Sequence, residues 1–134
     1  MTSADVAYAI ERSASPNVGN AYFTSYLGSA APAPLEGATA SYKGGPIPGI
    51  KTPNKFTIVF HTLKPSGAFL ISALSLPVSM PVPQSFAGPM DKHAPTTSGT
   101  KFLVSSGPYM VKSDPKTGAI ATGVGSWVLR PEWA

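Results

Sequence analysis

Near the start of the chain, apolar residues recur at the three-to-four-residue spacing that places them on one face of an α-helix. Residues 2–5 (Thr-Ser-Ala-Asp) match a capping box, in which the threonine and the aspartate satisfy each other's free backbone N–H groups. The apolar stripe of the predicted helix consists of Val6, Ala9 and Ile10. Ser15-Pro16-Asn17 is expected to end the helix, because proline cannot continue it.

A second, short helix is predicted over residues 21–27, followed by Gly28 at the position where helices commonly end in glycine. The spacing of its large side chains gives it an aromatic face of Tyr22, Phe23, Tyr26 and Leu27. Two interpretations of Tyr22 and Tyr26 stay open. They can cover the core, or they can offer rings and hydroxyls to a ligand cleft.

Residues 55–63 alternate two sets of side chains with the period of a β-strand. Both sets are largely apolar, so the pattern predicts a central strand covered on both faces, with Pro53-Asn54 as its lead-in turn. A third helix is predicted to start at Pro65-Ser66 and to run to about Ser75. Its expected buried residues are Phe69, Leu70, Ala73 and Leu74.

Proline and glycine divide the rest of the chain. Residues 28–50 are expected to be a loop, and the three prolines of residues 77–83 predict an extended segment that can lie only at a sheet edge. Residues 84–100 are expected to be mobile and polar. Residues 107–113 are expected to pair with residues 119–130 across a turn at 114–118.

The order helix, helix, strand, helix, hairpin predicts an α+β fold. We expect a small, mixed and mainly antiparallel sheet, about three short helices and long loops rich in proline and glycine. The chain has 134 residues, which is the size of a single domain over residues 1–134.

Composition removes several classes of function. Only 12% of the residues are charged, and the net charge of +4 comes from scattered lysines with no run of three basic residues. Nucleic-acid binding needs clustered cations, so no nucleic-acid partner is expected. The chain has no cysteine, which excludes disulfides, thiolate ligands and thiol nucleophiles. No apolar stretch reaches the length of a membrane span.

The residues that carry out chemistry are few. His61 lies in the predicted strand and His93 in the polar loop, where Asp91 is the nearest acidic residue. Neither histidine has the ligand spacing of a metal site, and no serine lies in a nucleophile elbow. The glycines and prolines of residues 44–49 lack the Gly-Lys-Ser/Thr of a phosphate-binding loop. We therefore expect no enzyme, no metal and no cofactor.

Five segments, in order, resemble motifs of the family 5 bacterial solute-binding proteins, the dipeptide, oligopeptide and nickel-binding group. Residues 2–12 resemble the family's "T-A-x-D-V-x-Y-S-x-x-R" helix. The other segments are residues 20–27, residues 50–60 with Lys64-Pro65, residues 69–83 and residues 106–111, the last of which is similar to "G-T-G-P-Y-x-V". Two features depart from the family pattern: Asn54 stands where the family has Asp, and residues 127–133 only partly match "L-x-R-N-P-x-W".

The resemblance implies a subdomain of the first lobe of a substrate-binding protein, beside the ligand cleft. Its solute would be a peptide or a similar small molecule, and its partners the remaining lobes and an ABC permease. It would work in an extracellular or periplasmic location or as a cell-surface lipoprotein, and the chain would be an excised domain without its signal. Tyr22 is the position that the resemblance places at the cleft, with Tyr26 second.

Two alternatives remain at this point. The proline-rich segment at 77–83 would suit a free-standing secreted interaction module. A small hydrolase would need a pocket that joins His61 or His93 to a serine.

Overall fold

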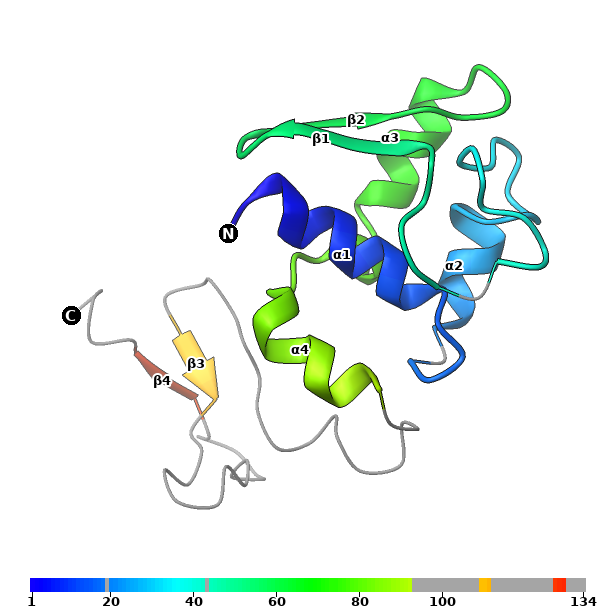
Figure 1. Cartoon of the computed structure of the whole chain (residues 1–134). Helices are drawn as coiled ribbons and strands as arrows, with labels where there is room; N and C mark the ends of the chain where they lie inside the picture. Colours follow the sequence, from blue (N-terminus) through cyan, green and yellow to red (C-terminus); the bar gives the residue numbers. More distant parts are fainter. Residues whose placement is uncertain (19, 43, 93–108, 112–126, 130–134) are drawn as a thin grey trace. The chain divides into compact units, whose positions relative to one another are not determined.

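A computed structural model describes residues 1–18, 20–42, 44–92, 109–111 and 127–129 (Figure 1). The chain divides into two compact units, residues 1–94 and 95–134, and each is described by itself. The first unit contains helices and an antiparallel strand pair, and the second contains another antiparallel pair. The predicted α+β class is therefore confirmed. None of the described helices is long and apolar enough to cross a membrane.

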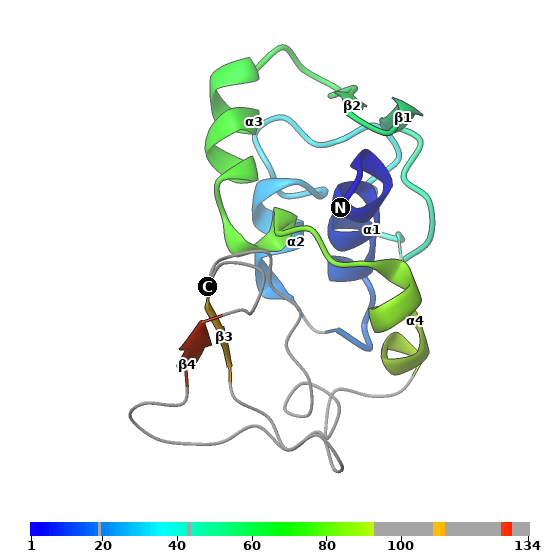
Figure 2. The same ribbon diagram turned by 90° about the vertical axis from the view of Figure 1, so that its left-hand side faces the viewer.

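Helix α1 (Ser3–Ser13) begins at the predicted capping box, where the Thr2 N–H donates to Asp5 Oδ2 at 2.6 Å. Its core-facing side is the predicted one, since Ile10 is completely buried and the neighbouring Ala9 is buried as well. In two perpendicular views, α1 lies between a β-hairpin on one side and helix α4 (Gln84–Asp91) on the other (Figures 1 and 2). This central place explains why most of its length is shielded from water.

The loop predicted over residues 28–50 contributes to the core although most of it forms no regular element. It contributes six buried hydrophobic side chains to the first unit: Ala31, Ala33, Leu35, Ala38, Ile47 and Ile50. Backbone hydrogen bonds fix its course, for example from the Glu36 N–H to the His61 carbonyl at 2.9 Å. This segment is thus irregular in backbone but fully part of the packed structure.

The strand predicted as central is wrong in position and in burial. Strands β1 (Ile50–Asn54) and β2 (Thr57–Phe60) form an isolated antiparallel pair with Ile50 opposite Phe60. The expected lead-in turn is therefore part of a strand, and Phe56 in the real turn is 90% exposed. Along β2, Ile58 and Phe60 pack against the core of the first unit, whereas Val59 on the other face is exposed.

Helix α3 (Gly67–Leu74) confirms the third predicted helix. Ala73 is buried, and the other three expected core residues are partly buried. The segment that follows was expected to be extended, but Pro77–Ser79 form a 3₁₀ turn, η1, with Val78 buried. A proline at the start of a helical turn loses no intrahelical hydrogen bond, which makes this geometry acceptable.

Residues 84–100 were predicted to be mobile and polar. This is wrong for residues 84–91, which form helix α4. The Pro83 carbonyl accepts hydrogen bonds from the Phe86 and Ala87 N–H groups, and Ala87 is buried. The remainder of that expectation, including the loop with His93, lies outside the described residues.

In the second unit, strands β3 (Tyr109–Val111) and β4 (Trp127–Leu129) are antiparallel, with Tyr109 opposite Leu129. Of the pairing predicted between residues 107–113 and 119–130, this confirms the part that joins residues 109–111 to residues 127–129. The expected turn at 114–118 lies outside the described residues. That residues 1–134 act as one domain stays a prediction.

Candidate functional site

Helix α2 (Ala21–Tyr26) divides its aromatic residues between the core and the surface. The Asn20 side chain caps the helix by accepting from the Tyr22 N–H at 3.0 Å. Phe23 is buried, as is Leu27 just after the helix, whereas Tyr22 is 53% and Tyr26 37% exposed. The core is therefore filled by the phenylalanine and the leucine, and the tyrosines are left at the surface.

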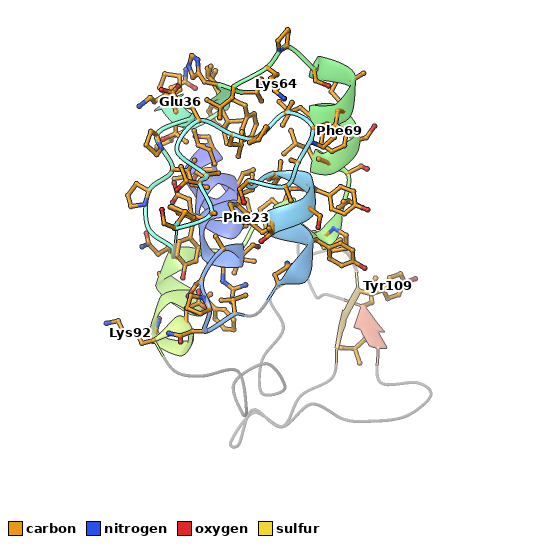
Figure 3. All side chains as sticks on the ribbon, turned by 90° about the vertical axis from the view of Figure 1, so that its right-hand side faces the viewer. Phe23, Glu36, Lys64, Phe69, Lys92 and Tyr109 are labelled. Atoms are coloured by element: carbon orange, nitrogen blue, oxygen red, sulfur yellow. The ribbon has the colours of Figure 1, made fainter. Side chains whose placement is uncertain are left out.

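Tyr22 and Tyr26, called here the tyrosine pair, lie side by side with ring centroids 5.9 Å apart and ring planes at 47°. Tyr26 also lies parallel to Phe69 of α3, with centroids 6.4 Å apart. Figure 3 shows the side on which α2 and α3 are neighbours, with Phe23 and Phe69 labelled. The structure thus brings together both tyrosines that the sequence singles out and adds Phe69 to them.

The helices around the tyrosine pair carry no charge. No Asp, Glu, Lys or Arg occurs in residues 13–35, which include α2, or in residues 65–90, which include α3. Rings and hydroxyls are therefore the groups that these two helices can offer to a ligand, and ion pairs would have to come from elsewhere.

A hollow of about 570 Å³ lies beside α1, between that helix, residues 44–46, β1 and α4. We call it the α1 hollow. The residues that line it include Ala7, Tyr8, Glu11, Arg12, Ile50 and Asp91. It therefore combines apolar side chains with a set of charged groups.

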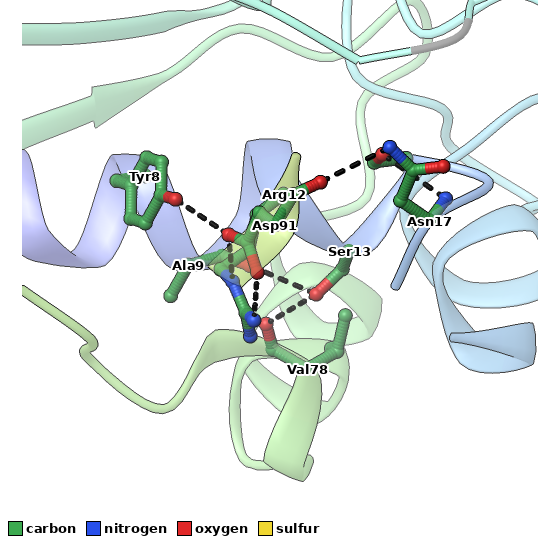
Figure 4. A network of polar contacts seen from close by, with 8 residues as sticks. Tyr8, Ala9, Arg12, Ser13, Asn17, Val78 and Asp91 are labelled. Carbon is green, nitrogen blue, oxygen red and sulfur yellow. Dashed lines mark hydrogen bonds and ion pairs between the residues drawn. The ribbon is translucent and has the colours of Figure 1, made fainter. Parts of the chain in front are cut away.

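One side of the α1 hollow is a network centred on Asp91, at the last residue of α4 (Figure 4). Arg12 donates from Nε to Asp91 Oδ2 at 2.7 Å and from its terminal NH2 group to Oδ1 at 2.5 Å. The Tyr8 hydroxyl donates to Asp91 Oδ2 at 2.5 Å, and the Asn17 side chain donates to the Asp91 carbonyl. A bidentate pair of this kind fixes orientation as well as charge, so it fastens α4 to α1.

The network shifts the pKa of each member in the direction that its contacts demand. Burial alone would raise the pKa of Asp91, but the hydrogen bonds from Arg12 and Tyr8 lower it below its usual value. Burial, and after it the hydrogen bond to Asp91, raises the pKa of Tyr8 to about 12. The hydrogen bond to Asp91 raises the pKa of Arg12. At neutral pH the network is therefore one carboxylate, one guanidinium and one neutral phenol.

Glu11 also lines the α1 hollow and is half-buried. Its Oε1 accepts from the Ile47 N–H at 3.0 Å. Burial raises the pKa of Glu11, and the hydrogen bond from Ile47 offsets only part of this. Burial, with the nearby charge of Glu11, also raises the pKa of Tyr42 to about 12. Glu11 thus carries a carboxylate that is only partly compensated by its surroundings.

From the sequence, Asp91 stands out only as the acidic neighbour of His93. The spacing of Tyr8 and Arg12, four residues apart on one helical face, indicates that these two side chains lie together, but it does not point to Asp91. His61 is exposed, and no group of three metal-ligating side chains occurs among the described residues. His93 lies outside the described residues.

A model of the bacterial extracellular solute-binding proteins, family 5 Middle, matches residues 1–121. No curated protein and no solved structure matches the chain. The family comprises solute-binding proteins that serve ABC import outside the cytoplasm, and it is not a family of enzymes. Since the match covers most of the 134 residues, the chain belongs to the family 5 bacterial extracellular solute-binding proteins.

Proposed function

We propose that the chain is part of the substrate-binding component of an ABC importer for peptides or similar small solutes. It acts as a scaffold beside the ligand cleft, and the tyrosine pair faces the solute. Its partners are the remaining lobes of the solute-binding protein and the ABC permease. Its place of action is the periplasm, the extracellular space or, as a lipoprotein, the cell surface. The observation that carries this proposal is the family match over residues 1–121.

The position of the tyrosine pair supports the ligand interpretation over the core-covering one. Phe23 and Leu27 already occupy the inward positions of α2, with 5% and 1% of their surfaces exposed. Tyr22, the residue expected at the cleft, is the more exposed of the two tyrosines. Two neighbouring rings at an angle form a surface on which an apolar group can lie while the hydroxyls donate hydrogen bonds.

The structure of residues 77–79, at the start of the proline-rich segment, does not support the alternative of a free-standing interaction module. That alternative needs an extended edge over residues 77–83. Residues 77–79 form a 3₁₀ turn in which Val78 and Ser79 are buried, so they offer no strand edge to a partner.

The proposal is tested by titrating the chain with di- to pentapeptides while following the tyrosine ring resonances by NMR. Because the other lobe completes the grip on the solute, the chain alone is expected to bind no peptide with micromolar affinity. Millimolar peptide is expected to shift the resonances of Tyr22 and Tyr26, and Tyr22→Ala is expected to weaken this effect at least several-fold.

Phe56→Ala is the matched control, because it removes an aromatic ring that is 90% exposed on a different element. Its titration is expected to equal that of the wild type. Micromolar affinity for the chain alone, or an equal loss in Tyr22→Ala and Phe56→Ala, would contradict the proposal.

A further inference from the structure

The α1 hollow has the size and the lining of a small-molecule site. Its volume of about 570 Å³ falls within the range of ligand pockets. Ala4, Ala7, Pro46 and Ile50 line it with apolar surface. Its polar groups come from the same few segments, so a ligand would meet both kinds of contact at once.

The charges around the hollow do not cancel. Arg12 is engaged by both oxygens of Asp91, which also holds the Tyr8 hydroxyl. The positive charge of Arg12 and the negative charge of Asp91 therefore offset each other. Among the hydrogen bonds and ion pairs of the described residues, Glu11 has only the neutral Ile47 N–H as a partner. The net charge of the described residues that line the hollow is therefore −1, and it lies on Glu11. Because Glu11 is half-buried, its charged form is unfavourable unless a cation pairs with it.

The rim of the hollow at residues 44–46 is held in place by two hydrogen bonds, one of them to Glu11. Gly44 and Gly45 adopt φ angles of 105° and 103°, which only glycine adopts readily. The Tyr42 hydroxyl donates to the Gly45 carbonyl, and the Ile47 N–H donates to Glu11. The loop is thus anchored at Gly45 and at Ile47, and the two glycines present backbone rather than side chains to the hollow.

We propose that the α1 hollow binds a small organic cation, an aliphatic primary amine, whose ammonium group pairs with Glu11 while its carbon chain packs on Ala7 and Ile50. This site is separate from the tyrosine pair and does not depend on the proposed function. An anionic ligand would meet Glu11 while Arg12 is already taken by Asp91. The net charge of +4 does not oppose the amine strongly, because charges beyond about 8–10 Å are screened at physiological salt.

The test is a titration of the chain with butylammonium, followed by NMR at the methyl groups of Ala7 and Ile50. Butanol and butyrate are the neutral and anionic probes of matching length. Shifts that saturate with butylammonium at millimolar concentration, and at least tenfold weaker effects of butanol and butyrate, are expected. Equal effects of butanol and butylammonium, or no saturation with the amine, would overturn the proposal without any mutation.

Glu11→Gln removes the charge but keeps an oxygen that can accept from the Ile47 N–H. We expect it to weaken butylammonium binding at least tenfold. Glu36→Gln is the matched control, because it makes the same change at an exposed residue that does not line the hollow. Unchanged binding by Glu11→Gln, or an equal loss in Glu36→Gln, would overturn the proposal.

Lys43 precedes the rim glycines and lies outside the described residues. A Lys43→Gln variant therefore belongs in the same series. If butylammonium binds only after this substitution, the proposal is also overturned, because the Lys43 ammonium group would then be the cation that pairs with Glu11.

Discussion

Glu11 and Asp91 both line the α1 hollow, but their surroundings move their pKa values in opposite directions. The Asp91 pKa is lowered, so its contribution to stability is present above its usual value of 3.8 and is lost as the pH falls through the folded-state value. The Glu11 pKa is raised, so its contribution is present below 4.5 and is lost as the pH rises through the folded-state value. Acidification from neutral pH should therefore first add stability through Glu11 and then remove it through Asp91.

Urea unfolding between pH 3 and pH 7 checks this expectation. Glu11→Gln is expected to flatten the upper part of the stability profile, because it abolishes the titration that adds stability. Asp91→Asn is expected to lower stability at neutral pH and to flatten the lower part, because the charged partner of Arg12 is gone. Profiles of both variants that run parallel to the wild type at every pH would contradict these assignments.

At the scale of elements, the hairpin β1–β2 is joined to the irregular segment before it at Gly49. A Cβ atom at Gly49 would lie 2.7 Å from the His61 carbonyl oxygen and 2.7 Å from the Glu36 nitrogen, both of them backbone atoms. The Gly49 N–H donates to the Glu36 carbonyl, and the Gly49 carbonyl accepts from the His61 N–H. There is no room for a side chain where these three backbones meet.

Gly49→Ala is therefore expected to lower the free energy of unfolding by about 1–3 kcal/mol, because overpacking forces the backbone apart. Gly67→Ala is the matched control, since a Cβ at Gly67 meets nothing within 4 Å. That variant should be unchanged or more stable by up to about 1 kcal/mol, because alanine restricts the unfolded chain. Urea denaturation of the two variants measures the difference, and similar stabilities would refute the packing argument.

The helices that could be predicted from the sequence are those with local signals. The capping box marks the start of α1, and Asn20 and Gly28 flank α2. Helix α4 lacked such signals, because Gly88 and Pro89 are typical of loops. Its contacts are instead with residues distant in the sequence, among them the pairing of Asp91 with Arg12. A local pattern cannot reveal an interaction across 79 residues.

The candidate sites also divide into one that a local sequence pattern predicts and one that depends on contacts between distant segments. The tyrosine pair was predictable because one helical turn brings the two residues together, although spacing alone left its role open. The α1 hollow was not predictable, because its lining comes from four segments that only the fold brings together. The strand over 55–63 was misjudged because its apolar alternation does not reveal that the partner strand is the segment just before it.

For the molecule as a whole, all the buried hydrophobic residues that the structure describes belong to the unit of residues 1–94. A unit with its own core is expected to fold by itself. A chain ending at residue 94 should therefore keep the helical far-ultraviolet circular dichroism of α1 to α4 and unfold cooperatively in urea. A gradual transition, or loss of the helical signal, would show that residues 95–134 are needed for the fold.

The irregular segment 28–50 has a consequence for protein engineering. Surface loops usually accept inserted tags or reporter domains, but six of the fourteen buried hydrophobic side chains in the described residues come from this segment. A sensor that reports solute capture by fluorescence would lose its scaffold if the reporter were inserted there. The turn at Phe56, which is 90% exposed between β1 and β2, is the place where a reporter can be added without dividing the core.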